Sequence, residues 1–391
     1  MTFFRRLSKG LLWRPSGCVR SVDHLDESHG VVAKHDVSEA IGAPGPKEYS
    51  LTAVELSRGK IIANLRLAAT ETDVVIGELQ SLYDCVEPQK HFLLHRSRFR
   101  IPKYRRGRAL LLGHGVGGGY YHWLVDSLPR WKILQAAGYV DYDYVLLPDS
   151  LLPFEEEMLD LLKIPRVKWL RCSKNFVHQF ERLVVPVMPA PVWEVPAWVC
   201  AWLRSLFPVQ NGGPELIYLS RRGTSRRRLV NEAELVAQLQ SVGFVSIQAE
   251  RFSVAEQARL FSSAKCVVAC HGAGLTNMVF APPNTLLVEL FHPDIVIRPA
   301  IQNIAAAAGL RYAAVRGIRT QASVPRHEEY AEFKMDPSAV FRAIEENNQL
   351  AKSSAPPAGY CSGILSTAPS IERENRDGRE GNQMQIRPAS A

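Results

Sequence analysis

The stretch "CVVACHGAGLTNMVFAPPNTLLVEL", from Cys266 to Leu290, contains a strand, a loop, a helix and a second strand in the order of an α/β unit. CVVAC and TLLVEL are short and apolar, as strands buried on both faces of a parallel sheet usually are. Between them, Gly272 and Gly274 stand where the chain leaves the first strand and enters a helix near Leu275. In open α/β sheets, ligands bind at this carboxyl edge of the strands. The stretch therefore predicts a parallel sheet with a ligand-binding loop.

Strands and helices alternate before this unit as well. The strands LIYLS (216–220) and FVSIQA (244–249) alternate with helical segments over 231–243 and 253–264. Each helix begins at an N-cap residue that is followed three positions later by a glutamate, and the first ends at a glycine. Four strands separated by helices predict a parallel sheet with right-handed crossovers.

An earlier part of the chain has a similar but less regular pattern. RALLLG (108–113), DYVLLP (143–148) and FERLVVPV (180–187) are expected to form strands, with helices over 120–138 and 154–164. We therefore expect an α/β protein with two Rossmann-like domains that face each other across a cleft.

Breaks in this pattern predict four segments. Glycine and proline interrupt it over 42–46 and 208–214, and after Cys361 the composition is typical of disorder. The predicted segments are an N-terminal extension (1–47), a first α/β domain (48–208), a second α/β domain (209–351) and a disordered tail (352–391).

The composition indicates a soluble globular protein with anionic partners. The 391 residues carry a formal net charge of +8, which favours phosphorylated ligands, a membrane surface or nucleic acid. No apolar run approaches the ~20 residues that a membrane-spanning helix needs. The basic start MTFFRRLSKG is a poor secretory signal. The seven cysteines include no CxxC pair, which predicts a reduced, cytosolic protein.

The loop after CVVAC has the features of an anion site. The first turn of a helix leaves backbone N–H groups unpaired and carries a partial positive charge, and the glycines let an anion approach the main chain. At neighbouring strand ends, Arg221 can bind a diphosphate and Glu289 can accept both ribose hydroxyls. The expected nucleotide-diphosphate pocket comprises Ser220, Arg221, His271, Gly272, Ala273, Gly274, Leu275, Thr276, Asn277 and Glu289.

HGAGLTNMVF, PNT and VEL, within 271–290, together with YYHWLVDSLPR, from Tyr120 to Arg130, resemble glycosyltransferase family 61. The likeness covers about Tyr120 to Phe291. It implies a GT-B fold, a nucleotide-sugar donor and an inverting transfer that needs no metal ion or other cofactor. Because many bacterial members are assigned to capsule or surface-polysaccharide synthesis, the resemblance also implies a saccharide acceptor. It leaves the donor sugar and the linkage open.

Inverting transfer needs a group that takes the proton of the acceptor hydroxyl. His122 and Asp126 are four residues apart and therefore lie on one helix face. Asp126 is the first candidate for the base, with His122 as its partner or as a contact to the donor sugar; the reverse assignment stays open. In a purely structural alternative, Asp126 only pairs with Arg130. Arg221, His271 and the helix opening would stabilise the departing diphosphate.

Three other patterns support competing functions. GHGVGG, Gly113 to Gly118, matches GxGxxG and would suit an NAD(P)-dependent oxidoreductase, but the nearest following acidic candidate, Asp149, is too distant. DYD, Asp141 to Asp143, resembles a metal motif but precedes its strand, so no metal is expected. The arginine runs RSRFRIPKYRRGR and SRRGTSRRR would suit a non-catalytic nucleotide- or RNA-binding protein. Since no nucleic-acid-binding motif accompanies them, no nucleic-acid partner is expected.

The charge and the family resemblance lead to an expectation about location. We expect a cytoplasmic transferase that acts at the inner face of a membrane on a lipid-linked saccharide. The basic surface would then make peripheral contact with anionic lipid.

Overall fold

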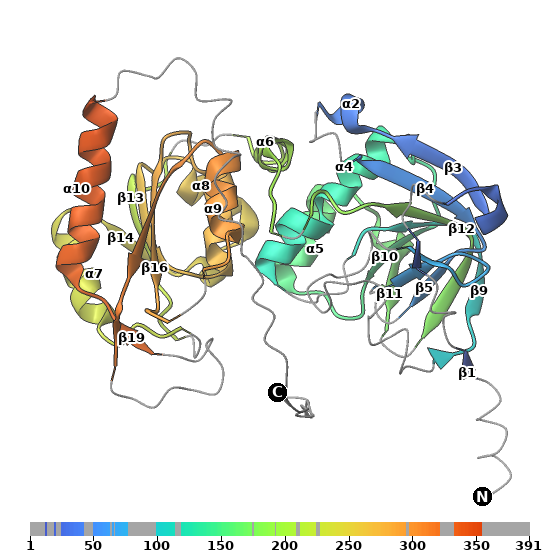
Figure 1. The fold of residues 1–391 in the computed structure, drawn as a ribbon, viewed down its shortest axis with the longest axis horizontal. Helices are drawn as coiled ribbons and strands as arrows, with labels where there is room; N and C mark the ends of the chain where they lie inside the picture. Colours follow the sequence, from blue (N-terminus) through green and yellow to red (C-terminus); the bar gives the residue numbers. More distant parts are fainter. Residues whose placement is uncertain are drawn as a thin grey trace, which may run out of the picture. The chain divides into compact units, whose positions relative to one another are not determined.

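The computed structural model describes residues 12–13, 19–20, 25–42, 50–62, 65, 67–76, 99–113, 119–173, 176–191, 193–208, 212–223, 227–294, 297–320 and 332–353. One compact unit ends at Asn347. It contains two large β-sheets, each with helices packed against it (Figure 1). The mixed α/β architecture with parallel strands confirms the α/β part of the predicted fold class.

The first sheet has ten strands and is mixed. Strands β11, β10, β9 and β12 are parallel neighbours, whereas β4 and β5 run antiparallel to β12. Strands β9, β10 and β12 confirm the strands expected in the earlier part of the chain, and β11 was not predicted. The ten strands are β2 (Val19–Arg20), β3 (Val31–Asp36), β4 (Thr52–Ser57), β5 (Lys60–Ile62), β6 (Leu67–Ala69), β7 (Val75–Ile76), β9 (Lys103–Leu111), β10 (Tyr144–Pro148), β11 (Trp169–Cys172) and β12 (Val177–Pro186).

The predicted N-terminal extension, 1–47, differs from the structure at β3. This strand pairs antiparallel with β4, so part of the expected extension belongs to the first sheet. Within the described residues β3 pairs only with β4, and most of its side chains are exposed. An edge strand of this kind is held by backbone hydrogen bonds and tolerates polar side chains. Its polar sequence, VVAKHD, therefore does not show the apolar alternation that reveals a half-buried strand.

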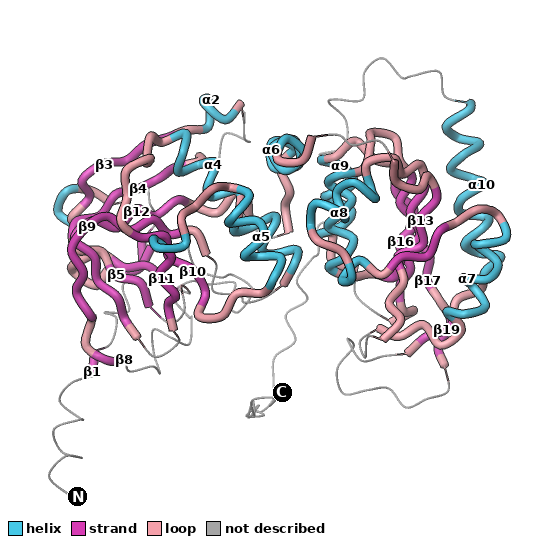
Figure 2. Tube along the Cα trace, turned by 180° about the vertical axis from the view of Figure 1, so that it is seen from behind, coloured by secondary structure: helices cyan, strands magenta, loops and turns pink. Residues whose placement is uncertain are grey.

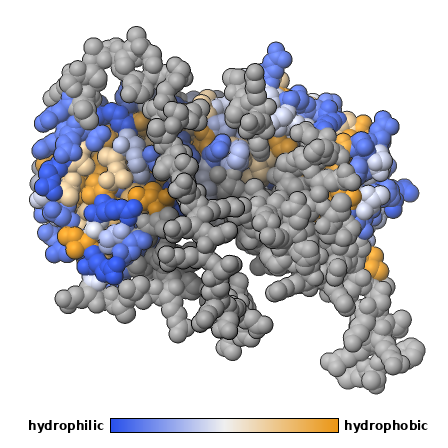
Figure 3. All heavy atoms as spheres, viewed as in Figure 1, coloured by the Kyte–Doolittle hydropathy of each residue, from blue (hydrophilic) through white to orange (hydrophobic). Residues whose placement is uncertain are grey.

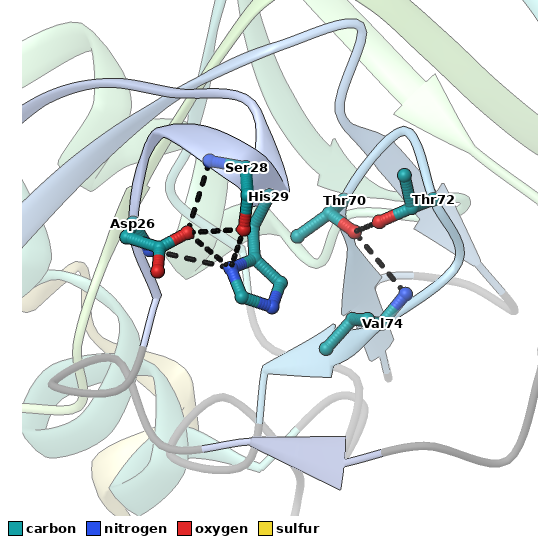
Figure 4. Close-up of polar contacts among 6 residues, drawn as sticks. All are labelled: Asp26, Ser28, His29, Thr70, Thr72 and Val74. Carbon is teal, nitrogen blue, oxygen red and sulfur yellow. Dashed lines mark hydrogen bonds and ion pairs between the residues drawn. The ribbon is translucent and has the colours of Figure 1, made fainter.

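Short polar motifs shape the turns around these strands (Figure 4). Before β3, the carboxylate of Asp26 accepts hydrogen bonds from the backbone N–H of Ser28 at 2.9 Å and from the ring of His29 at 2.8 Å. These bonds close the single-turn helix η2 (Glu27–His29). The Ser28 hydrogen bonds, followed by the His29 hydrogen bond, lower the pKa of Asp26 to about 2. In the β6–β7 turn, the Thr70 hydroxyl oxygen accepts from the Val74 N–H at 3.1 Å.

The second sheet has five strands, all parallel, in the order β14-β13-β15-β16-β17. Four of them confirm the predicted strands, and β17 is an addition that the sequence analysis did not identify. Helices α8 and α9 lie on one face and α7 and α10 on the other (Figures 1 and 2). The five strands are β13 (Leu216–Leu219), β14 (Val245–Ile247), β15 (Cys266–Cys270), β16 (Leu286–Phe291) and β17 (Arg311–Arg316).

Local sequence signals explain several helix boundaries. Ser253 accepts a hydrogen bond from the Glu256 N–H and Glu256 reaches back to Ser253, which confirms the predicted capping box of α8. Gly243 follows α7 with a φ of +95°, a conformation that favours glycine.

The remaining helices and small sheets complete the described structure. They are α2 (Ser38–Ile41), α4 (Pro129–Ala136), α5 (Pro153–Leu161), α6 (Ala197–Ser205), α7 (Glu232–Ser241), α8 (Val254–Phe261), α9 (Ala300–Ala307), α10 (Pro337–Ser353), the 3₁₀ turns η6 (Arg166–Lys168) and η7 (Ala249–Arg251), and the pairs β1 (Leu12–Trp13) with β8 (Phe99–Arg100) and β18 (Ile318–Arg319) with β19 (Phe333–Lys334).

One hydrophobic cluster contains side chains of α4 and α5 as well as of α8, α9 and the second sheet. Helix α6 packs on η8 (Ala273–Phe280), the helix that follows β15. The guanidinium of Arg204 donates to the carbonyls of Val279 and Ala281 at 2.5 and 2.8 Å, where it complements the negative end of η8. The carboxylate of Glu157, on α5, accepts from the first two N–H groups of α8. Arg204 therefore holds the end of η8, and Glu157 holds the start of α8, which packs against η8.

The described residues also show how the helices, the surface and the cysteines compare with the sequence predictions. Among the helices that the structure describes, none combines the length and apolarity that crossing a membrane requires. The described surface in Figure 3 mixes hydrophilic and hydrophobic residues. Cys172, Cys200, Cys266 and Cys270 are buried free thiols. The predicted tail, 352–391, lies outside the described residues apart from its first two residues, which end α10.

Candidate active site

The predicted donor loop leaves β15 at Cys270 and enters η8 at Ala273, close to the expected helix start. Gly272 is extended, with a φ of 171°, and the Leu275 N–H donates to its carbonyl at 3.0 Å. His271, Ala273 and Gly274 reach the surface, whereas the following residues are buried. The exposed part of the loop therefore presents a helix start whose first backbone N–H groups lack helical acceptors, which is the arrangement that binds anions.

Two arginines lie against this loop. The guanidinium of Arg221 packs so closely on Gly272 that a Cβ added there would overlap Nη1. Arg227 Nη1 donates to the His271 carbonyl at 2.9 Å. Two guanidinium groups beside an open helix start make a strongly positive site with geometry suited to phosphate oxygens. Arg221 was predicted, but Arg227 was not singled out, although it lies in the basic run SRRGTSRRR.

Ser220 has a supporting position at the end of β13. Its hydroxyl donates to Oε1 of Glu232 at 2.9 Å. The same carboxylate oxygen of Glu232 also accepts from the Arg221 N–H at 3.0 Å. Glu232 begins α7. These bonds tie the strand end to α7 and fix the backbone from which the Arg221 side chain extends.

Glu289 is placed differently from the expected ribose contact. Its side chain is 1 % exposed, and its Oε1 lies 2.5 Å from Nδ1 of His271. The other oxygen accepts from the hydroxyl of Tyr312 at 2.8 Å. Because both oxygens face protein partners, Glu289 contacts His271 and Tyr312, and the described conformation does not present it to a ribose. Tyr312, on the strand β17, was not a predicted site residue.

The buried residues at the start of η8 were also expected to contact the nucleotide directly, and the structure places them differently. Leu275, Thr276 and Asn277 are fully buried. Asn277 donates to the side chain of Gln257 at 2.6 Å and to the Gly274 carbonyl at 3.1 Å. These residues support the loop from inside. The sequence pattern did not separate them from the exposed residues because η8 is 3₁₀ and turns more tightly than an α-helix.

His122 and Asp126 are brought together as predicted. Nδ1 of His122 lies 2.7 Å from Oδ2 of Asp126, and their side chains are 23 % and 11 % exposed. They lie on a single π-helical segment, η5 (His122–Ser127), in which the Leu128 N–H bonds to the Trp123 carbonyl. π-Helical turns inside longer helices are frequent at functional sites.

The expected long helix over 120–138 thus consists of η5 followed by α4. Pro129 is the first residue of α4, where its missing N–H costs nothing. Arg130, the alternative partner of Asp126, is buried and donates to the Gly113 carbonyl at 2.9 Å. Arg130 therefore connects α4 to the end of the β9 segment in addition to any contact along its own helix.

Aromatic side chains surround the His122–Asp126 pair. The rings of Tyr121 and Trp193 have centroids 5.3 and 6.5 Å from that of His122. Burial, and next the charge of Asp126, raise the pKa of Tyr121. Trp193 has a φ of +70° and lies under the Arg298 guanidinium. A non-glycine residue held in this backbone region is more common at functional sites than elsewhere.

One hydrogen bond connects the His122 segment to the donor loop. The hydroxyl of Tyr120 donates to Oδ1 of Asn277 at 2.7 Å. Tyr120 precedes His122 by two residues, and Asn277 lies in η8. The two predicted motifs, about 150 residues apart in the sequence, are therefore neighbours in space.

The competing patterns have different outcomes. Most of Gly113–Gly118 lies outside the described residues. Asp143, of the DYD pattern, accepts from the Arg108 N–H at 2.7 Å, which agrees with a role in strand and turn structure. Across the part of the chain that the structure describes, no three His, Cys, Asp or Glu side chains are grouped as metal ligands would be. A cavity of about 550 Å³ near α6 and α8 is lined by none of the predicted site residues.

Comparison with known proteins finds a family match over part of the chain. Residues 120–288 match the family model "Glycosyltransferase 61". A β-1,2-xylosyltransferase of Oryza sativa subsp. japonica is 41 % identical over 78 residues, which are 20 % of this chain and 16 % of that protein. An α-1,3-arabinosyltransferase of the same organism is 30 % identical over 118 residues, covering 28 % and 20 %. The protein O-linked-mannose β-1,4-N-acetylglucosaminyltransferase 2 of Xenopus tropicalis is 38 % identical over 85 residues, covering 21 % and 15 %.

The aligned regions span about a fifth or less of the length of these relatives. The family model, in contrast, begins at Tyr120 and ends within β16, so it contains the His122–Asp126 pair, the two arginines and the donor loop. By this match, residues 120–288 of the chain are identified as a glycosyltransferase family 61 region.

Proposed function

We propose that this protein is an inverting glycosyltransferase that moves a sugar from a nucleotide-diphosphate donor to a hydroxyl group of a saccharide. The observation that carries the proposal is the Tyr120–Asn277 hydrogen bond, which connects a His–Asp pair to a cationic helix start. The two halves of the site supply the two requirements of the reaction. One half can take a proton, and the other can stabilise a departing diphosphate.

In the proposed step, the acceptor oxygen attacks the anomeric carbon of the donor sugar from the face opposite the diphosphate. The new C–O bond forms as the bond to the diphosphate oxygen breaks, and that oxygen keeps the electron pair. The acceptor proton passes to the His–Asp pair. Arg221, Arg227 and the N–H groups at the start of η8 stabilise the negative charge on the leaving group. The transfer needs no metal ion in this scheme.

The geometry favours His122 as the base and Asp126 as its orienting partner, which is the reverse of the first sequence-based assignment. Asp126 is the less exposed of the two, and its Oδ2 faces Nδ1 of His122. In catalytic pairs of this form the carboxylate fixes the ring orientation and stabilises the imidazolium, while Nε2 accepts the proton. We therefore propose Nε2 of His122 as the proton acceptor.

We further propose a GT-B arrangement, in which the first sheet domain contributes the base and the second binds the donor. The division between residues 208 and 209 remains the proposed domain boundary, and the first domain is extended toward the N-terminus to include β3. A role in surface or capsular polysaccharide synthesis, a lipid-linked acceptor, contact with anionic membrane and a cytoplasmic location remain predictions from charge and family resemblance. The family match does not favour the oxidoreductase or RNA-binding alternatives.

The first experiment is a thermal-shift and calorimetric screen against UDP, GDP, CDP, CMP, NAD and NADP, with and without EDTA. We expect one nucleoside diphosphate to stabilise the protein equally in both conditions. Arg221→Ala should weaken its binding about tenfold or more, because a charge-assisted hydrogen bond contributes ~1.5–3 kcal/mol. Stabilisation by NAD or NADP alone would contradict the proposal, and loss of nucleotide binding in EDTA would contradict its metal-independent form.

A further inference from the structure

Three side chains form a continuous hydrogen-bonded row across the second sheet, from Tyr312 through Glu289 to His271. The Tyr312 hydroxyl donates to Oε2 of Glu289 at 2.8 Å, and Oε1 lies 2.5 Å from Nδ1 of His271. Each oxygen of the carboxylate thus serves one neighbour. We call this row the Tyr–Glu–His relay.

Strand register explains why these residues meet. Glu289 is paired with Ala269 on β15 and with Ala314 on β17. His271 comes two residues after Ala269, and Tyr312 two residues before Ala314. Since side chains two apart on a strand point to the same face, both flank Glu289 on one face of the sheet. The relay is therefore built into the pairing of β15, β16 and β17.

The relay determines which nitrogen of His271 is available to a ligand. An ionised carboxylate can only accept hydrogen bonds, so Nδ1 of His271 must carry a hydrogen to bond Glu289. The ring also stacks on Phe291, with centroids 5.2 Å apart and planes 23° apart. Nδ1 is thus engaged inside the protein, and Nε2 is the nitrogen through which His271 can contact a bound group.

We propose that Tyr312 is a positioning residue for donor binding, which holds Glu289 so that His271 presents Nε2 to the diphosphate. The inference rests on the proposed function and extends it to a residue 41 positions beyond His271 in the sequence. Tyr312 does not itself touch the donor. It acts through the buried carboxylate, because its hydroxyl is the hydrogen-bond donor that Oε2 of Glu289 has among the described residues.

Two further observations support a lasting contact. Burial, and then the negative charge of Glu289, raise the pKa of Tyr312, so its hydroxyl stays a donor. Glu289 has almost no exposure to solvent. Water therefore cannot readily replace the tyrosine, and a buried acceptor that loses its donor carries a desolvation cost.

The test compares Tyr312→Phe with Tyr142→Phe, a matched change at a buried tyrosine of the first sheet domain. ¹⁵N-histidine NMR reports which nitrogen of His271 carries hydrogen, with the resonance assigned by His271→Gln. Calorimetry with inorganic pyrophosphate measures binding without assuming a nucleotide base. Tyr312→Phe should shift the His271 resonances and weaken pyrophosphate binding about fivefold, as loss of one hydrogen bond predicts. Tyr142→Phe should change neither measurement.

Unchanged His271 resonances in Tyr312→Phe would overturn the relay, whatever happens to affinity. If Tyr312→Phe does not fold, Glu289→Gln provides the second test, because its amide can donate to Nδ1 and should move the hydrogen to Nε2. An unmoved hydrogen in Glu289→Gln would also overturn the relay. Failure of the wild-type protein to bind any nucleoside diphosphate would refute the proposed function separately, since the NMR measurement needs no ligand.

Discussion

Two histidine–aspartate pairs in this protein have nearly the same geometry but different surroundings. The His29 and Asp26 side chains approach to 2.8 Å, and those of His122 and Asp126 to 2.7 Å. Asp26 is 68 % exposed and closes a single-turn helix together with Ser28 (Figure 4). Asp126 is largely buried on a π-helical turn. Its partner His122 lies beside aromatic rings and two residues after Tyr120, which contacts the donor loop.

The difference shows that a short distance between two groups does not identify a catalytic pair. Water screens the exposed carboxylate of Asp26, which also accepts hydrogen bonds from the backbone and hydroxyl of Ser28. Around the buried pair, the lower effective dielectric strengthens the interaction and fixes the ring. Burial and neighbouring groups therefore distinguish a candidate active site from a helix cap.

The largest effect is predicted in a comparison that substitutes the histidine of each of the two pairs in turn. His122→Gln should lower the transfer rate about a thousandfold, since general base catalysis contributes roughly 10²–10⁴-fold, and should leave donor affinity within about twofold. His29→Gln should change neither quantity. Initial-rate assays with the donor identified by the screen, together with calorimetry, measure both. Normal transfer by His122→Gln would refute the assignment of this pair as catalytic.

A third histidine, His178, has a buried ring that lies near positively charged side chains. Burial, followed by the charges of Arg105 and Lys103, lowers the pKa of His178 from 6.5 to about 4. Between these values the unfolded chain binds more protons, so stability is fully present above pH 6.5 and is lost as the pH falls toward 4.

Replacing His178 should remove this part of the pH dependence. Urea unfolding of the wild type at pH 7 and pH 4.5 should differ by about 2–3 kcal/mol more than that of His178→Gln. His29→Gln is the control at a histidine outside this buried site and should keep the wild-type difference. An equal loss of stability in wild type and His178→Gln would show that His178 titrates normally in the folded protein.

The smallest effect is predicted for nucleotide affinity, in a comparison of two adjacent arginines, one at the site and one on the surface. Arg227 donates to the His271 carbonyl, whereas Arg228 pairs with Glu332 at 3.0 Å on the surface. Arg227→Ala should weaken nucleoside-diphosphate binding about tenfold, and Arg228→Ala less than about twofold. Calorimetry at fixed ionic strength measures both. Equal losses would indicate a diffuse effect of charge and would exclude a specific role for Arg227.

Local sequence patterns determined much of the second sheet domain. The apolar runs predicted β15 and β16, and the capping box of Ser253 predicted the start of α8. The spacing of His122 and Asp126 predicted their contact because residues four apart on a helix are neighbours. These features depend on residues close in sequence, for which periodicity and caps carry the information.

The tertiary structure decided how the site is assembled. Strand register buried Glu289 between His271 and Tyr312, and long-range packing brought Tyr120 to Asn277 and Arg227 to the His271 carbonyl. The edge strand β3 joined the first sheet through backbone bonds that its polar side chains did not signal. Each of these contacts joins residues that only folding brings together. Because their energies depend on burial and on partners distant in sequence, residue type and spacing alone did not reveal them.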